Sequence, residues 1–104
     1  MNMQNRRAVP RVGLVADVWL GEDGVFTRGR ERLTNLSVGG AFIEATGGFA
    51  VGSVVSLRFS LGRDYITSTS IVRYVGPYRG IGVEFIDISP ENKQRLASFI
   101  DART

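Results

Sequence analysis

Apolar and polar residues alternate along most of the chain, and short glycine-containing segments interrupt the alternation. Val12, Leu14, Ala16 and Val18 are each separated by one residue, so in an extended segment their side chains point to the same face. The same pattern, in part with Thr, Ser, Ile and Val, continues over residues 25–33, 41–45, 54–61, 65–75 and 81–85. The periodicity therefore predicts six short β-strands, the first over residues 12–19.

Gly, Asp and Pro mark the ends of these predicted strands. GEDG (21–24), LGRD (61–64) and GPYRG (76–80) are typical turn sequences, and NLSVGG (35–40) interrupts the alternation between the second and third strands. Six short strands at close spacing favour a small antiparallel barrel. Closure also removes the exposed edges that an open sheet of this size would leave.

The last segment, SPENKQRLASFI, has a different period. Ser89 is a suitable N-cap residue and Pro90 suits the first helical position. Leu96, Phe99 and Ile100 follow at i, i+3 and i+4, which gives one apolar helix face. We therefore expect a helix over residues 89–102 that packs on the sheet or covers a barrel end. The predicted fold class is all-β, a six-stranded antiparallel β-barrel with a C-terminal α-helix.

Length and composition are those of one globular domain, expected to span residues 1–104. The chain has 104 residues, of which 43% are hydrophobic and 22% charged. We expect no membrane insertion, because no apolar run approaches the ~18 residues of a membrane span. The charged N-terminus lacks the apolar segment of a signal peptide, and cysteine is absent. These features favour a cytoplasmic protein.

The absence of histidine and cysteine limits the chemistry. It excludes Ser-His and Cys-His nucleophile pairs and the usual zinc ligands. A carboxylate-only site would need converging acidic residues, but the 10 Asp and Glu residues are scattered without paired spacing. We therefore expect neither an enzyme nor a bound cofactor or metal.

Arginine dominates the positive charge. The formal net charge is +3, and 12 of the 13 basic residues are arginine. Arginine has a planar guanidinium that suits phosphates and guanine edges, although a codon bias would give the same composition. Three arginines occur in NRRAVPRV (5–12), where Arg7 and Arg11 are four residues apart and Pro10 disfavours a helix. A solvated basic terminus is the alternative reading of this segment.

NLSVGG has the features of a ligand-binding loop. Asn35 and Ser37, at i and i+2, are expected to point the same way. Gly39 and Gly40 allow φ > 0 and a close approach of backbone N–H groups to a ligand. The alternative is a hairpin turn in which Asn and Ser bond to the local backbone.

These two segments together resemble the signatures of the PilZ domain family, bacterial receptors for cyclic di-GMP. Arg7-Ala-Val-Pro-Arg11 matches RxxxR, and Asn35-Leu-Ser37-Val-Gly-Gly40 matches [D/N]xSxxG, roughly 25 residues later. The ending GIGVEFIDISPENKQRLASFI also resembles the closing strand and helix of the family. The resemblance covers nearly the whole chain, and we therefore expect a stand-alone, single-domain member of this family.

The resemblance implies a ligand on the outer barrel surface, covered by a flexible N-terminal arm over residues 1–11. Arg7 and Arg11 would bind guanine edges and phosphates. Asn35 would accept from the guanine N1/N2 edge, and Ser37 would donate to a phosphate. Gly40, with Gly39, would keep the surface clear of a Cβ that clashes with the ligand. The family often has Asp at position 35, and Asn loses a charge-assisted bond worth ~1 kcal/mol.

Two further arginines are assigned to the site. Arg6 precedes RxxxR, and in similar proteins an arginine here accompanies two intercalated cyclic di-GMP molecules, so we expect a dimeric ligand. Arg73 lies between Val72 and Tyr74; if these two face the core, its guanidinium lies outside and can stack on guanine. Solvated arginines are the alternative in both cases. Trp19 and the tyrosines are expected in the core or at its rim, and most phenylalanines at core-like positions.

The expected function is that of an adaptor without catalysis. Ligand binding would order the N-terminal arm and alter the interaction with an unidentified downstream protein in motility or biofilm regulation. The chain is expected to be a monomer or a weak homo-oligomer. One alternative is a PilZ-fold protein–protein interaction module without nucleotide binding. Another is a small-barrel binder of single-stranded nucleic acid, which would need exposed aromatic residues interleaved with basic ones.

Overall fold

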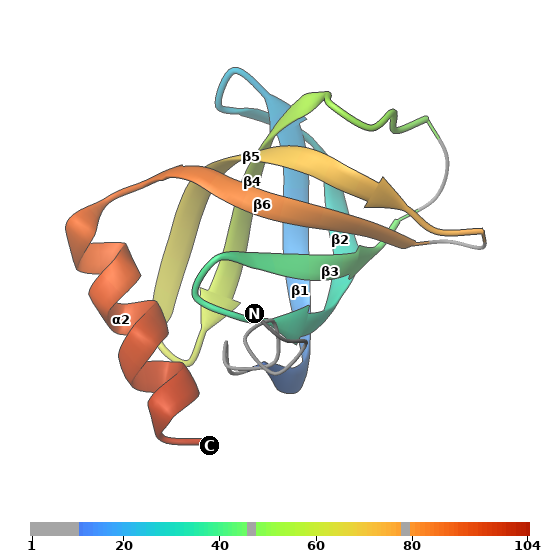
Figure 1. Cartoon of the computed structure of the whole chain (residues 1–104). Helices are drawn as coiled ribbons and strands as arrows, with labels where there is room; N and C mark the ends of the chain where they lie inside the picture. Colours follow the sequence, from blue (N-terminus) through green and yellow to red (C-terminus); the bar gives the residue numbers. More distant parts are fainter. Residues whose placement is uncertain (1–10, 46–47, 78–79) are drawn as a thin grey trace, which may run out of the picture.

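The chain forms a closed β-barrel followed by one helix (Figure 1). The computed structural model describes residues 11–45, 48–77 and 80–104. Within these ranges the strands are β1 (Val12–Glu22), β2 (Val25–Leu36), β3 (Gly40–Glu44), β4 (Val54–Leu61), β5 (Asp64–Val75) and β6 (Gly80–Ile88), and the helix is α2 (Pro90–Asp101). The strands close in the order β1-β2-β3-β6-β5-β4, and all neighbours are antiparallel. The predicted fold class is confirmed.

Several strands are longer than predicted, and the difference at β2 affects the site. β2 continues to Leu36 rather than ending near residue 33, because Asn35 pairs with Phe42 and Leu36 with Ala41 in β3. The non-strand segment therefore begins at Ser37 and not at Asn35. The predicted GEDG turn is shorter than expected, and its positive φ angles occur at Asp23 and Gly24.

The barrel interior is mostly apolar, as the alternation predicts, although the Ser68 and Ser70 hydroxyls of β5 are buried as well and lie 3.2 Å apart. Along β4 the inward side chains Val55, Leu57, Phe59 and Leu61 are all buried. Each fully buried side chain of this kind contributes roughly 1.5–3 kcal/mol of transfer free energy. The other strands and the helix contribute Val12, Val18, Leu20, Leu33, Leu36, Ala41, Ile43, Ala45, Ile66, Val72, Ile81, Val83, Leu96 and Ile100 to the same core.

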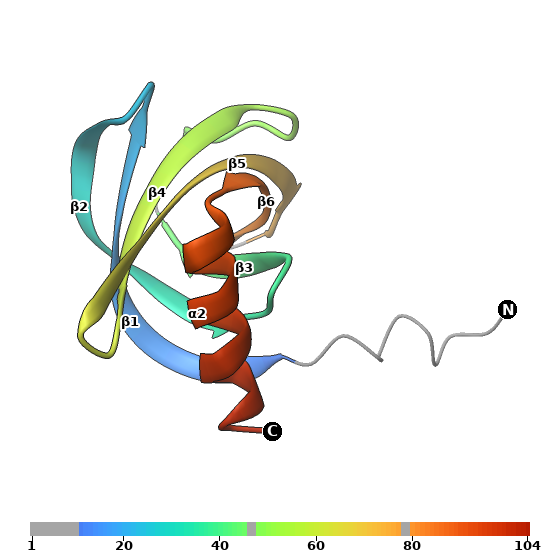
Figure 2. The same cartoon turned by 90° about the vertical axis from the view of Figure 1, so that its left-hand side faces the viewer.

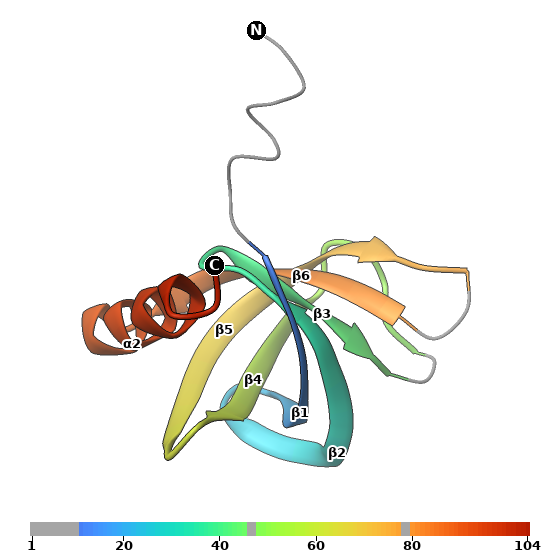
Figure 3. The same ribbon diagram turned by 90° about the horizontal axis from the view of Figure 1, so that it is seen from below.

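The C-terminal helix has the predicted start and the predicted apolar face. The Ser89 hydroxyl accepts a hydrogen bond from the Asn92 N–H at 3.1 Å, and Pro90 is the first helical residue. Leu96 and Ile100 are buried in the barrel core. In Figure 2 the helix lies in front of the barrel, and Figure 3 shows it outside the strands at one side. None of the described residues belongs to a helix long and apolar enough to cross a bilayer.

Candidate ligand-binding site

Two β-bulges turn successive side chains of β2 and β5 toward one face of the barrel. In the β2–β3 pairing the register shifts between Leu33 and Asn35, so Thr34 is the extra residue. In the β5–β6 pairing it shifts between Val72 and Tyr74, so Arg73 is the extra residue. A bulge re-aims a side chain that regular alternation would send to the opposite face.

The residues at both bulges line one depression on the outside of the barrel. Its volume is about 720 Å³, within the range of ~300–1,000 Å³ that is typical of small-molecule sites. The lining comes from the residue before β1, the end of β2, the β2–β3 turn, β3, β5 and β6. It consists of Arg11, Thr34, Asn35, Ser37, Gly39, Gly40, Ala41, Phe42, Arg73, Tyr74, Gly82, Val83 and Glu84.

A row of paired residues crosses the floor of this depression. Asn35 on β2 pairs with Phe42 on β3, Phe42 pairs with Gly82 on β6, and Gly82 pairs with Tyr74 on β5. The Phe42 and Tyr74 rings have centroids 6.4 Å apart. The Phe42 ring lies against Gly80, where a Cβ would be 2.1 Å from its Cζ, so glycine is required there. The row therefore presents two aromatic rings beside an amide side chain.

The β2–β3 turn is held by hydrogen bonds of Ser37. Its backbone N–H donates to the Gly40 carbonyl at 2.9 Å. Its hydroxyl accepts from the Gly39 N–H at 3.3 Å and donates to the Gly40 carbonyl at 3.4 Å. These are the local side-chain-to-backbone bonds expected if the segment is simply a hairpin turn. The bond from the Ser37 hydroxyl to the Gly40 carbonyl must break if the hydroxyl donates to a phosphate.

The structure requires a glycine at one position of the turn, Gly40, but not at the other, Gly39. Neither has the positive φ angle that we expected. A Cβ at Gly40 would lie 2.1 Å from the Val83 carbonyl oxygen, so close approach of β3 to β6 requires glycine there. A Cβ at Gly39 would meet nothing within 4 Å. Gly39 is exposed at the edge of the depression, and the described residues give no packing reason for a glycine.

The structure brings six of the eight predicted site residues to this depression. They are Arg11, Asn35, Ser37, Gly39, Gly40 and Arg73. The other two, Arg6 and Arg7, lie outside the described residues. Arg73 lies outside the core as expected. Of its two neighbours, Val72 is buried as expected, whereas Tyr74 is 53% exposed and does not face the core.

Sequence reasoning missed several residues of the depression, among them Phe42, Tyr74 and Glu84. Tyr74 was expected in the core or at its rim, and Phe42 at a core-like position; both rings face the depression instead. For Tyr74 the signal was hidden, because the bulge at Arg73 changes which face Tyr74 occupies, and bulges are not visible in the alternation. Phe42 lies between the buried residues Ala41 and Ile43, so the regular alternation of β3 already directs its side chain outward. Glu84 was missed as well. Its carboxylate accepts a hydrogen bond from the Nε–H of Arg73, with a distance of 2.8 Å.

Comparison with known proteins gives a family and a fold. A family model described as PilZ domain matches residues 5–102. No curated protein sequence matches the chain significantly. The solved structure of the Bacillus subtilis inhibitor of motility (MotI/DgrA) is 25% identical, with a TM-score of 0.78 over 94% of this chain and 50% of that protein. This chain thus spans only half the length of that inhibitor.

A second solved structure supports the same fold. The PilZ domain of CeSA from a cellulose-synthesizing bacterium is 19% identical, with a TM-score of 0.66. The alignment covers 89% of this chain and 96% of that domain. At this identity the likeness concerns the fold alone.

Proposed function

Since this chain belongs to the PilZ domain family, a family of cyclic di-GMP receptors and adaptors, we propose that it binds cyclic di-GMP in the depression on β3 and β6. The observation that carries this proposal is the convergence of the two motifs. Arg11 from one motif and Asn35, Ser37, Gly39 and Gly40 from the other line a single surface.

The chemistry of the depression suits the two parts of this ligand. Guanine bases stack on aromatic faces, and such stacking is worth ~1–3 kcal/mol per base; Phe42 and Tyr74 offer two faces. Asn35, next to Phe42 in the row, is suited to accept from the guanine N1/N2 edge. Arg11 and Arg73 are suited to phosphates or to guanine O6 and N7.

The N-terminal arm is part of the proposed site. Arg7 lies four residues before Arg11, which is at the edge of the depression. Binding would bring Arg7 and Arg6 over the ligand, and the rearranged surface would then be recognised by a downstream protein. Two intercalated ligand molecules carry four phosphate charges, for which Arg6 supplies an additional counter-charge. Given the likeness to an inhibitor of motility, control of motility is the proposed pathway.

Calorimetry with cyclic di-GMP tests the proposal. We expect saturable binding that GMP and a single-stranded oligonucleotide do not reproduce. Arg7→Ala/Arg11→Ala should weaken it about 100-fold or more, because each charged hydrogen bond contributes roughly 1.5–3 kcal/mol. Arg63→Ala/Lys93→Ala is the matched control, since it removes two exposed positive charges away from the site. A stoichiometry of two ligands per chain supports the Arg6 assignment, and one contradicts it.

Absence of binding at high micromolar ligand, in calorimetry and in equilibrium dialysis, would overturn the proposal. The domain would then be an interaction module of the same fold. Binding of the oligonucleotide instead would favour the nucleic-acid alternative.

A further inference from the structure

A second hollow lies on the wall of the barrel opposite the depression. In the closed order, β1 and β4 are separated by a strand on each side from β3 and β6. On the outside of this wall, Trp19 of β1, Phe26 of β2, Arg58 of β4 and Tyr65 of β5 line a space of about 230 Å³. We refer to these four residues as the aromatic hollow.

The side chains of the aromatic hollow hold one another in position. Trp19 and Arg58 are paired across β1 and β4. The Arg58 guanidinium carbon lies 4.6 Å from the centre of the Tyr65 ring, a cation–π contact. The Trp19 and Tyr65 rings have centroids 6.4 Å apart and are inclined by 60°. Side chains that are already ordered lose less conformational entropy when a partner binds.

These residues are not required to fill the core. The inward face of the same strands is occupied by buried residues such as Leu20, Leu57 and Phe59. Tyr65 is 51% exposed, and Arg58 is exposed as well. Tryptophan, tyrosine and arginine are the residue types most enriched among the side chains that dominate protein–protein binding energies. Their clustering in one exposed hollow therefore indicates an interaction surface.

The charge and hydrogen-bonding groups of the hollow define the partner. Of the described residues that line the hollow, only Arg58 carries a formal charge. Guanidinium and indole groups are donors only, and a phenol can also donate. A complementary group must therefore accept hydrogen bonds, carry negative charge and lie beside apolar surface. We propose that the aromatic hollow binds a partner-protein segment in which a carboxylate side chain adjoins an apolar or aromatic one.

A single-stranded nucleic acid fits this wall less well. Such ligands need a positive groove that follows a chain of phosphates. Here the described lining of the hollow offers one positive charge, that of Arg58. One carboxylate needs only Arg58, whereas successive phosphates of a bound strand would need further cations along the hollow.

Peptide selection on the full chain tests the inference. The selection is carried out in the absence of nucleotide, so that its outcome is independent of cyclic di-GMP binding. A random 12-residue peptide library displayed on phage is selected on the wild-type chain. The selected peptides are then measured against Arg58→Ser/Tyr65→Ser and against the matched control Arg63→Ser/Val54→Ser, which changes an exposed arginine and an exposed apolar residue elsewhere. Trp19 is the single tryptophan of the chain, so its fluorescence reports binding at the hollow.

We expect enrichment of peptides with Asp or Glu next to Leu, Pro or aromatic residues, and a saturable change in Trp19 fluorescence. Binding should fall at least tenfold in Arg58→Ser/Tyr65→Ser and be unchanged in the control. Arg58→Glu should reject the acidic peptides and accept versions with Lys in their place. Failure to enrich peptides, enrichment of basic ones, equal binding to the double variant, or preferential binding of oligo-dT would each overturn the inference.

Discussion

Arg73 on β5 donates from its Nε to a carboxylate oxygen of Glu84 on β6, with a separation of 2.8 Å, inside the proposed cyclic di-GMP site. Both side chains are more than half exposed, at 58% and 51%. An exposed pair of this kind contributes only ~0–1 kcal/mol to folding. Its main effect is to orient Arg73 and to hold a negative charge where the phosphates are expected.

Glu84→Gln should therefore tighten cyclic di-GMP binding by about two- to fivefold. The amide oxygen can still accept from Arg73, while the repulsion between carboxylate and phosphate is removed, an effect of roughly 0.5–1 kcal/mol near a protein surface. The gain should be larger at low salt than at high salt. Calorimetry at two salt concentrations measures both effects.

Glu44→Gln is the control for this prediction, since Glu44 is exposed on β3 but does not line the depression. It should leave the affinity nearly unchanged. If Glu84→Gln instead weakens binding, the carboxylate contacts the ligand directly, most simply at a guanine N–H edge.

Gly39 and Gly40 in the β2–β3 turn provide a test of the site geometry. Gly40→Ala should lower the unfolding free energy by ~1–3 kcal/mol, because its Cβ would lie 2.1 Å from the Val83 carbonyl oxygen and the strands must move apart. Gly39→Ala should keep the melting temperature within a few degrees, since its Cβ meets no atom within 4 Å. It should nevertheless weaken cyclic di-GMP binding several-fold by adding a methyl group to the depression.

Thermal unfolding followed by circular dichroism, together with calorimetry, separates the two variants. Equal losses of stability in both would show that the turn does not have the spacing described here. Unchanged affinity in Gly39→Ala would place the ligand away from the turn.

Much of the fold is encoded in the alternation, and much of the site is not. The inward residues of β4 and the helix start at Ser89 and Pro90 were predicted correctly, because period and capping are local properties. The position of Tyr74 was not, since it depends on a bulge in the pairing of distant strands. The pairing of Arg73 with Glu84 likewise depends on register. The outward position of Phe42 could have been predicted, because Ala41 and Ile43 on either side of it face inward.

Tyr74→Ala should weaken cyclic di-GMP binding by about tenfold, whereas Tyr74→Phe should retain the wild-type affinity. The reason is that stacking uses the ring and not the hydroxyl, at ~1–3 kcal/mol per base. Tyr74 is 53% exposed, so neither change should lower the melting temperature by more than a few degrees. Equal weakening by both substitutions would indicate that the hydroxyl, rather than the ring, contacts the ligand.

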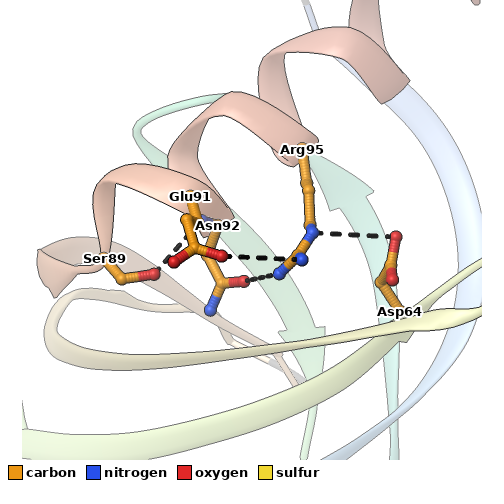
Figure 4. A network of polar contacts seen from close by, with 5 residues as sticks. All are labelled: Asp64, Ser89, Glu91, Asn92 and Arg95. Atoms are coloured by element: carbon orange, nitrogen blue, oxygen red, sulfur yellow. Dashed lines mark hydrogen bonds and ion pairs between the residues drawn. The ribbon is translucent and has the colours of Figure 1, made fainter.

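The helix start gives a prediction about stability that is independent of the ligand. Figure 4 shows Ser89 bonded to the Asn92 N–H, with Arg95 reaching Asn92, Glu91 and Asp64. Ser89→Ala removes the N-cap acceptor and should cost about 1 kcal/mol, or roughly 4–8 °C in melting temperature for a domain of this size.

Ser89→Asp is the matched rescue. It restores an acceptor and adds a negative charge at the helix N-terminus, which is favourable there, so the melting temperature should return to within about 2 °C of the wild type. A Ser89→Ala melting temperature equal to that of the wild type would contradict the assigned capping role.

The most direct test of the central claim is a titration of ¹⁵N-labelled protein with cyclic di-GMP, followed by amide chemical shifts. The account predicts that the largest changes occur at Asn35, Ser37, Gly39, Phe42, Tyr74 and Gly82, the turn and the row that crosses the depression. Little change is expected at Trp19 and Tyr65 on the opposite wall. Changes concentrated on that wall, or none at saturating ligand, would contradict the assignment of this surface as the nucleotide site.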